Sequence, residues 1–148
     1  MRSTLAEKSY QLFCRTKPAP YLRWLGGKRS IASEIVRLMP AKFGHYWEPF
    51  CGAAGIYMNM QFLLSRAPFP ATLSDLDPLL IAAHRAVRDH PDAVTRAYAI
   101  RQRQNSKSYF LAVRSDRPDD PIEAAALYIY LNHSCWSCLL YTSDAADE

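Results

Sequence analysis

Two glycine-containing segments carry residues that could bind a nucleotide-like ligand. Residues 48–55 read E-P-F-C-G-A-A-G and stand between a stretch with strand character and a helical pattern. Small residues at such a turn let the backbone approach a ligand closely, and the next helix begins with N–H groups that can face it. Asp75, 27 positions after Glu48, ends the next predicted strand, where an acid can bind ribose hydroxyls. The full G-x-G-x-x-G pattern is missing, so a tight turn beside a solvated Asp75 explains these residues equally well.

The second segment, residues 21–29, reads Y-L-R-W-L-G-G-K-R. Its two glycines permit a bend, Lys28 offers a positive charge, and Trp24 could stack on an adenine ring or a base. A phosphate-binding P-loop is excluded, because Arg29 stands where Ser or Thr is required and Leu22 stands where Gly is required. A buried Trp24 beside a solvated Lys28 is the alternative for each residue taken singly.

The elements that would position these residues alternate along the first half of the chain. Helices are predicted by apolar residues at helical spacing after Gly27, after Ala53 and from Pro78. The apolar faces expected for them are Ile31, Ile35 and Leu38; Ile56, Met60 and Leu63/Leu64; and Leu80, Ala83/His84 and Val87. Short strands are predicted at 46–50 and 71–74. This order predicts an α/β fold with a parallel sheet and covering helices.

Beyond residue 90 the alternation stops. Residues 91–114 are predicted to be wholly helical, and residues 118–121, P-D-D-P, form a break. A final amphipathic helix is predicted from Ile122, Ala125/Ala126, Ile129 and Tyr130. The sequence therefore predicts that a helical subdomain begins near residue 79.

Composition is that of an ordinary globular protein, with 49% hydrophobic and 22% charged residues. The chain has no run of about 18 apolar residues, and its first eight residues carry charges where a signal peptide needs an apolar stretch. A cytoplasmic location is therefore expected. Four cysteines are too few and too scattered for a disulfide scaffold.

The last eleven residues, 138–148, read C-L-L-Y-T-S-D-A-A-D-E and resemble the translation of a transposase-type sequencing adaptor. A natural C-terminus is the alternative. This tail holds three of the 14 acidic residues and none of the 18 basic ones, so the formal charge of +4 becomes +7 without it. Cys135 and Cys138 form a C-x-x-C pattern that could indicate a redox pair or half a zinc site. A foreign Cys138 would remove that meaning.

Four short segments occur in one order at suitable spacing: W-L-G-G-K at 24–28, E-P-F-C-G at 48–52, S-D-L-D-P at 74–78 and L-N-H-S-C at 131–135. This series resembles the Dam-type adenine-specific DNA methyltransferases over about residues 18–137. The resemblance implies an incomplete Rossmann-like S-adenosylmethionine-dependent methyltransferase fold, followed by the start of a helical target-recognition subdomain. It also implies S-adenosylmethionine as cofactor and double-stranded DNA as partner, with methyl transfer to the exocyclic amine of adenine. No metal, no membrane partner and a monomeric state are expected.

The resemblance assigns roles to five residues: Trp24 and Lys28 contact S-adenosylmethionine, Phe50 and Gly52 shape its pocket, and Asp75 binds its ribose. The sequence departs from the family pattern at three places. Ala53 and Ala54 replace a more Gly-rich turn, which their small side chains should tolerate. Asp77 stands where Asn is frequent, and His133 stands where Arg is commoner and could weaken a phosphate or structural contact. Candidate DNA-contacting residues are Arg96, Arg103, Lys107, Asn132 and His133, with Arg101, Arg114 and Arg117 as further basic residues of the helical segment. A solvated helix face is the alternative for each basic residue.

The family's catalytic D-P-P-Y-type motif is absent from the sequence, because the strings beginning at Asp77 and Asp120 lack the second Pro and the aromatic residue. The adenine amine is a poor nucleophile, and that motif supplies the acceptors and the aromatic that hold the flipped base. No catalytic residue is therefore assigned, and the chain by itself is expected to be inactive.

The expected organisation is an N-terminal extension at 1–17, a cofactor-binding part at 18–78, the truncated helical start of the target-recognition domain at 79–137, and the adaptor-like tail at 138–148. Two other functions stay open: a non-catalytic DNA-binding helical module on a nucleotide-binding-like scaffold, and another Rossmann-like nucleotide enzyme.

Overall fold

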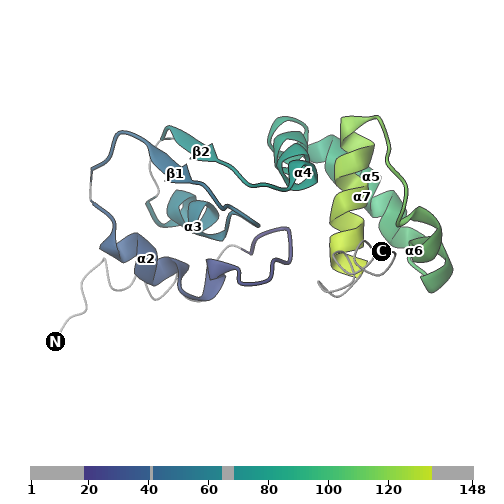
Figure 1. Cartoon of the computed structure of the whole chain (residues 1–148), viewed down its shortest axis with the longest axis horizontal. Coiled ribbons are helices and arrows are strands. Elements are labelled where there is room, and N and C mark those ends of the chain that lie inside the picture. The colour runs from purple at the N-terminus through teal and green to yellow at the C-terminus, as the bar shows by residue number, and fades with distance from the viewer. Residues whose placement is uncertain (1–18, 41, 65–68, 135–148) are drawn as a thin grey trace, which may run out of the picture. The chain divides into compact units, whose positions relative to one another are not determined.

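The computed structural model describes residues 19–40, 42–64 and 69–134 (Figure 1). These residues form two compact units. The sheet unit contains residues 19–20 and 26–73, and the helical unit contains residues 21–25 and 74–134.

The sheet unit has the predicted α/β alternation. Its elements are η1 (Lys28–Ser30), α2 (Ala32–Leu38), β1 (Tyr46–Glu48), α3 (Gly55–Leu64) and β2 (Ala71–Leu73). The two strands pair in parallel, with Tyr46 opposite Ala71 and Glu48 opposite Leu73. The prediction of a parallel sheet is thus confirmed for these two strands. Because the strands are parallel and in register, the chain leaves both of them at the same edge of the sheet.

The helix predicted after Gly27 is present as α2, and of the three apolar residues that predicted it only Ile35 is half-buried. Ile31 and Leu38 are 46% and 87% exposed, whereas Ala32, Ser33 and Val36 are buried. The helix packs against α3 and η1 through this neighbouring stripe. The small side chains of Ala32 and Ser33 let the backbone of α2 approach its neighbours closely. The positions of the large apolar residues therefore did not identify the packed face of α2.

The helical unit consists of α4 (Pro78–Asp89), α5 (Pro91–Arg103), α6 (Lys107–Val113) and α7 (Pro121–Ser134). Residues 91–114 are therefore not one helix, as the sequence predicted. The helical hydrogen bonding stops at Gln104, and the Ser106 hydroxyl then accepts a hydrogen bond from the Tyr109 amide at 3.2 Å as the N-cap of α6. A serine at this position starts a new helix because it satisfies an N–H group that has no partner within the helix.

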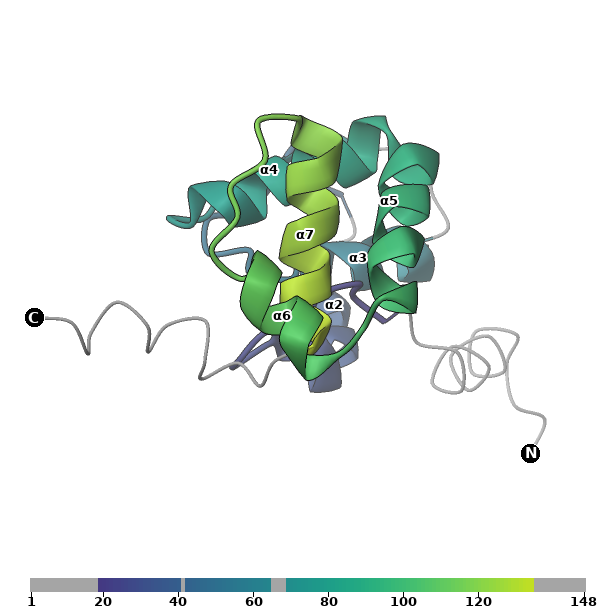
Figure 2. The same cartoon turned by 90° about the vertical axis from the view of Figure 1, so that its right-hand side faces the viewer.

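Helix α7 lies in the middle of the helical unit, and Figure 2 shows it between α4, α5 and α6. The sequence predicted an amphipathic helix, yet α7 is buried around much of its circumference. The buried residues are Ala125, Ala126, Leu127, Ile129, Tyr130, Leu131 and Asn132. A helix enclosed by three others has no wide solvent-facing stripe, so its apolar residues need not follow a single face.

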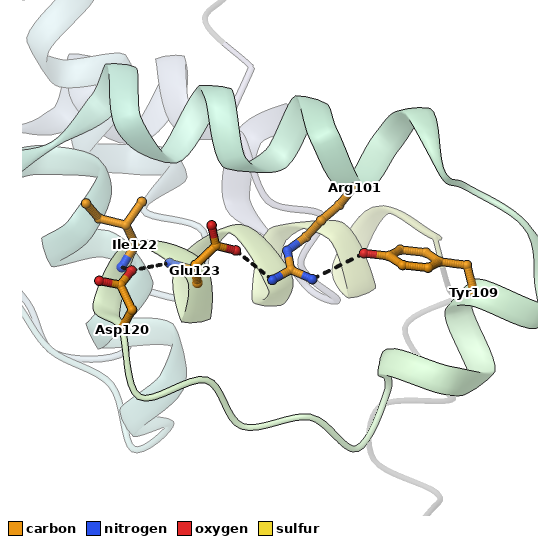
Figure 3. A network of polar contacts seen from close by, with 5 residues as sticks. All are labelled: Arg101, Tyr109, Asp120, Ile122 and Glu123. Atoms are coloured by element: carbon orange, nitrogen blue, oxygen red, sulfur yellow. Dashed lines mark hydrogen bonds and ion pairs between the residues drawn. The ribbon is translucent and has the colours of Figure 1, made fainter.

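An ion pair connects α5 to α7 in the helical unit (Figure 3). The Arg101 guanidinium lies 2.7 Å from the Glu123 carboxylate and donates to the Tyr109 hydroxyl at 3.3 Å. Asp120, at the start of α7, accepts hydrogen bonds from the amides of Ile122 and Glu123. The Arg101 side chain is 13% exposed. Its charge is therefore used within the unit, which sets Arg101 apart from the exposed basic residues of the same segment.

Candidate cofactor site

The connection from β1 to α3 is a tight turn built for close backbone packing. Residues 51–55 are buried, and the Ala54 amide donates to the Cys51 carbonyl at 2.7 Å. Gly52 has a φ of 47° and Ala54 a φ of 53°. This backbone conformation is natural for glycine but costs a residue with a Cβ on the order of 1 kcal/mol. In contrast, the Phe50 side chain is 82% exposed, so the turn presents an aromatic ring outward from a fixed backbone.

Glu48 is the last residue of β1 and precedes this turn in the sequence. It is buried, and its Oε2 atom accepts a hydrogen bond from the Tyr57 amide at 3.1 Å and another from the Tyr46 hydroxyl at 2.9 Å. Burial raises the pKa of the Glu48 carboxyl above its ordinary value, despite these hydrogen bonds. Burial, with the neighbouring Glu48 carboxylate, also raises the pKa of Tyr46. Glu48 thus connects the strand to the first turn of α3, a role that the sequence analysis missed.

Replacing Glu48 by glutamine tests this environment through pH. Because the pKa in the folded state lies above the unfolded value near 4.5, the folded state keeps the Glu48 proton to higher pH than the unfolded chain does. The free energy of unfolding of the wild type, relative to Glu48→Gln, should therefore be highest in acid and fall as pH rises through that window. Urea denaturation of both proteins between about pH 4 and pH 7 measures the difference. A difference that stays flat or rises with pH would contradict this account.

The turn that carries Lys28 lies against the start of α3. A Cβ atom placed on Gly55 would lie 3.5 Å from the Arg29 amide nitrogen, so the two backbones pass close together. Gly26 has a φ of 71°, and its carbonyl accepts a hydrogen bond from the Lys28 Nζ at 2.6 Å. Within the sheet unit the structure therefore brings the η1 turn to the first residue of the helix that follows Gly52.

Trp24 and Asp75, the other two predicted cofactor residues, belong to the helical unit. Trp24 is half-buried in the segment 21–25. Asp75 is half-buried two residues after β2, and its Oδ1 accepts from the Asp77 amide at 3.3 Å. The five predicted residues thus fall in both units, with Lys28, Phe50 and Gly52 in the sheet unit.

Asp77, which departs from the family pattern, is the N-cap of α4. Its Oδ1 accepts hydrogen bonds from the amides of Leu79 and Leu80, and its Oδ2 accepts from the Tyr128 hydroxyl at 2.9 Å. An N-cap aspartate followed by proline is a favourable helix start. Asp77, two residues after Asp75, therefore fixes the beginning of α4 and joins this helix to α7.

The five candidate DNA-contacting residues differ in their surroundings. Arg96, Arg103 and Lys107 are exposed. Asn132 is 6% exposed, and its side-chain amide bonds to the main chain of Arg23. The Nε2 atom of His133 lies 2.6 Å from the carbonyl oxygen of Tyr21. Because a carbonyl oxygen can only accept a hydrogen bond, this nitrogen carries the proton.

Several predictions fall outside the described residues. The N-terminal extension, the pair Cys135 and Cys138, and the tail 138–148 are among them. Within residues 19–40, 42–64 and 69–134, no group of three or more His, Cys, Asp or Glu side chains is arranged to hold a metal ion. None of the helices in those ranges is both long and apolar enough to cross a membrane.

Comparison with known proteins gives the family. The family model for D12 class N6 adenine-specific DNA methyltransferases matches residues 24–147. The chain belongs to this family. The resemblance to Dam-type enzymes is thus confirmed. The match runs on into residues 138–147, so it does not separate the adaptor-like tail from the rest, and the foreign origin of that tail stays a prediction.

Individual relatives agree with the family match. The chain is 33% identical over 118 residues to the type II methyltransferase M1.LlaDCHI of Lactococcus lactis subsp. cremoris, covering 76% of this chain and 39% of the relative. It is 28% identical over 133 residues to a DNA adenine methylase of Haemophilus influenzae, and the match covers 86% of this chain and 44% of the relative. A DNA adenine methylase of Salmonella typhi is 30% identical over 120 residues, covering 78% and 41%. The chain thus spans less than half the length of these relatives.

Proposed function

We propose that this chain carries the S-adenosylmethionine-binding residues of an adenine-specific DNA methyltransferase with a Rossmann-like fold. The reaction is transfer of the donor's methyl group to the exocyclic amine of adenine in double-stranded DNA. The observation that carries the proposal is the turn after β1, where an exposed Phe50 stands on a buried backbone with positive φ at Gly52 and Ala54. Such turns at the carboxyl ends of parallel strands are where α/β folds bind nucleotide-like ligands.

The residues present fit such a donor. An exposed aromatic ring at Phe50 can stack on adenine, and the Asp75 carboxylate can accept hydrogen bonds from ribose hydroxyls. Trp24 and Lys28 add a second aromatic ring and a positive charge, the latter suited to the donor's carboxylate. Once bound, the donor brings an electrophilic methyl group on a sulfonium. The chain's own residues bind and orient that molecule.

The DNA partner is supported by exposed basic side chains on α5 and α6. Arg96, Arg103 and Lys107 are exposed, and cations on a helix surface can neutralise phosphates. Arg101, by contrast, is paired with Glu123 at 2.7 Å. We therefore assign the phosphate contacts to the exposed residues and not to Arg101.

Equilibrium dialysis of the 148-residue chain against methyl-tritiated S-adenosylmethionine tests the donor assignment. We expect saturable binding that S-adenosylhomocysteine displaces and that NAD and ATP do not. Competition by NAD or ATP would favour another nucleotide enzyme instead. Salt-sensitive DNA binding without donor binding would favour the DNA-binding module.

The same labelled donor tests the reaction. With an adenine-containing duplex present, we expect the chain to hold the donor but to leave the DNA unlabelled, because its sequence has no D-P-P-aromatic string. Labelled N6-methyladenine in the digested DNA would contradict this part of the proposal.

A further inference from the structure

The end of α7 holds the segment 21–25 by its main chain. The Arg23 amide donates to the Oδ1 of Asn132 at 2.8 Å, and the Nδ2 of Asn132 donates to the Arg23 carbonyl at 2.9 Å. One side chain thus satisfies both backbone groups of a residue that lies 109 positions earlier in the sequence. Asn132 is 6% exposed whereas Arg23 is exposed, so the bonds are partly buried, and leaving the buried Asn132 amide unpaired is costly.

Neighbouring contacts fix the same segment. Leu22 is 4% exposed, and the Tyr21 hydroxyl lies 2.6 Å from the Nδ1 of His84 on α4. The Tyr21 carbonyl accepts from the Nε2 of His133 at 2.6 Å. Leu25, the residue after Trp24, is 86% exposed. Within this segment, Asn132 therefore acts on the residue next to Trp24.

We propose that Asn132 is a positioning residue that sets the backbone at Trp24, and not a DNA-contacting residue. Both hydrogen-bonding ends of its amide are used by Arg23, which leaves Asn132 poorly suited to reading a base. The orientation of Trp24 toward the methyl donor then depends on Asn132. This last step rests on the proposed function, in which Trp24 contacts S-adenosylmethionine.

Two substitutions separate the contributions of the amide. Asn132→Leu keeps a similar volume and removes both hydrogen bonds. Asn132→Asp keeps an acceptor for the Arg23 amide and removes the donor to the Arg23 carbonyl. The matched control is Tyr130→Phe, which removes one hydrogen bond, to Asn105, from a buried residue of the same helix.

Amide hydrogen exchange at Arg23 reports the contact directly. In Asn132→Leu we expect the Arg23 amide to exchange about tenfold faster or more, in Asn132→Asp to keep most of its protection, and in Tyr130→Phe to stay within about twofold of wild type. Acrylamide quenching of Trp24, measured in a Trp47→Phe/Trp136→Phe background, should increase in Asn132→Leu and stay unchanged in the control. Equal changes in Tyr130→Phe, or none in Asn132→Leu, would overturn the proposal.

Dialysis with labelled S-adenosylmethionine completes the test. We expect about tenfold weaker binding for Asn132→Leu, a smaller loss for Asn132→Asp, and none for Tyr130→Phe. Unchanged donor affinity with lost Arg23 protection, or lost DNA affinity with unchanged Trp24 quenching, would overturn the positioning role. If the wild type itself bound no donor, the proposed function would fail. The Arg23 amide exchange and the Trp24 quenching would still decide whether Asn132 fixes the backbone of residues 21–25. If Asn132→Leu does not fold, the comparison of donor affinity between Asn132→Asp and Tyr130→Phe decides the positioning role. A loss in Asn132→Asp alone would support it, and equal affinities would overturn it.

Discussion

Alanine at Phe50 is expected to weaken S-adenosylmethionine binding by about 10–100-fold, because stacking of a base on an aromatic ring contributes about 1–3 kcal/mol. Alanine at Asp75 should have a similar effect, since hydrogen bonds from hydroxyls to a carboxylate contribute about 1.5–3 kcal/mol. Phe50 is 82% exposed, so its removal should leave the free energy of unfolding nearly unchanged. Equilibrium dialysis and urea denaturation of each variant measure the two quantities.

Matched substitutions separate a specific contact from a general surface effect. Leu38 is 87% exposed in the sheet unit, and Asp119 is exposed in the helical unit. Leu38→Ala and Asp119→Ala should both bind the donor as the wild type does. Donor affinity that survives both Phe50→Ala and Asp75→Ala would show that the turn after β1 and the residues after β2 are not the binding site.

Alanine at Tyr130 should destabilise the helical unit by about 3–5 kcal/mol, as large aromatic-to-alanine changes do in protein cores. Tyr130 is fully buried at the centre of α7, its ring packs edge-on against Tyr109, and its hydroxyl donates to Asn105 at 2.9 Å. Domains are usually stable by only about 5–15 kcal/mol, so this loss is a large fraction of the total. Thermal and urea denaturation followed by circular dichroism measure it.

The size of this effect should depend on the ring and not on the hydroxyl. Tyr130→Phe removes the hydrogen bond alone and should cost about 1 kcal/mol. Leu111→Ala, at a position that is 50% exposed, should cost less than Tyr130→Ala. Equal losses for Tyr130→Ala and Leu111→Ala would mean that α7 is not the centre of the unit's core.

Much of the element order could be predicted because local chemistry determines it. Pro78 marks the start of α4, and strand-like stretches at 46–50 and 71–74 contain the observed parallel pair. The packed face of α2 could not be predicted, since the small residues Ala32 and Ser33 are buried there while the larger Leu38 is exposed. Likewise α7 is buried on several sides because three helices surround it, and a single helix's sequence does not reveal its neighbours.

The residues of the candidate site also include some that could be predicted from the sequence and some that could not. Glycine, aromatic and acidic residues at the ends of predicted strands could be recognised from their spacing. The roles of Glu48 and Asn132 could not be recognised, because each depends on a partner that folding brings close. Glu48 bonds to Tyr57 nine residues later, and Asn132 bonds to Arg23 across 109 residues. The sequence suggested a DNA contact for Asn132, whereas its amide bonds to the backbone beside Trp24.

Nuclear magnetic resonance titration of the isotope-labelled 148-residue chain with S-adenosylhomocysteine tests the central claim, that this chain binds the methyl donor through the predicted residues. We expect saturable chemical-shift changes at the amides of residues 50–55 and 74–77 and at the Trp24 indole N–H, with little change at the exposed residues of α6. No change on titration, or changes confined to α5 and α6, would contradict the claim.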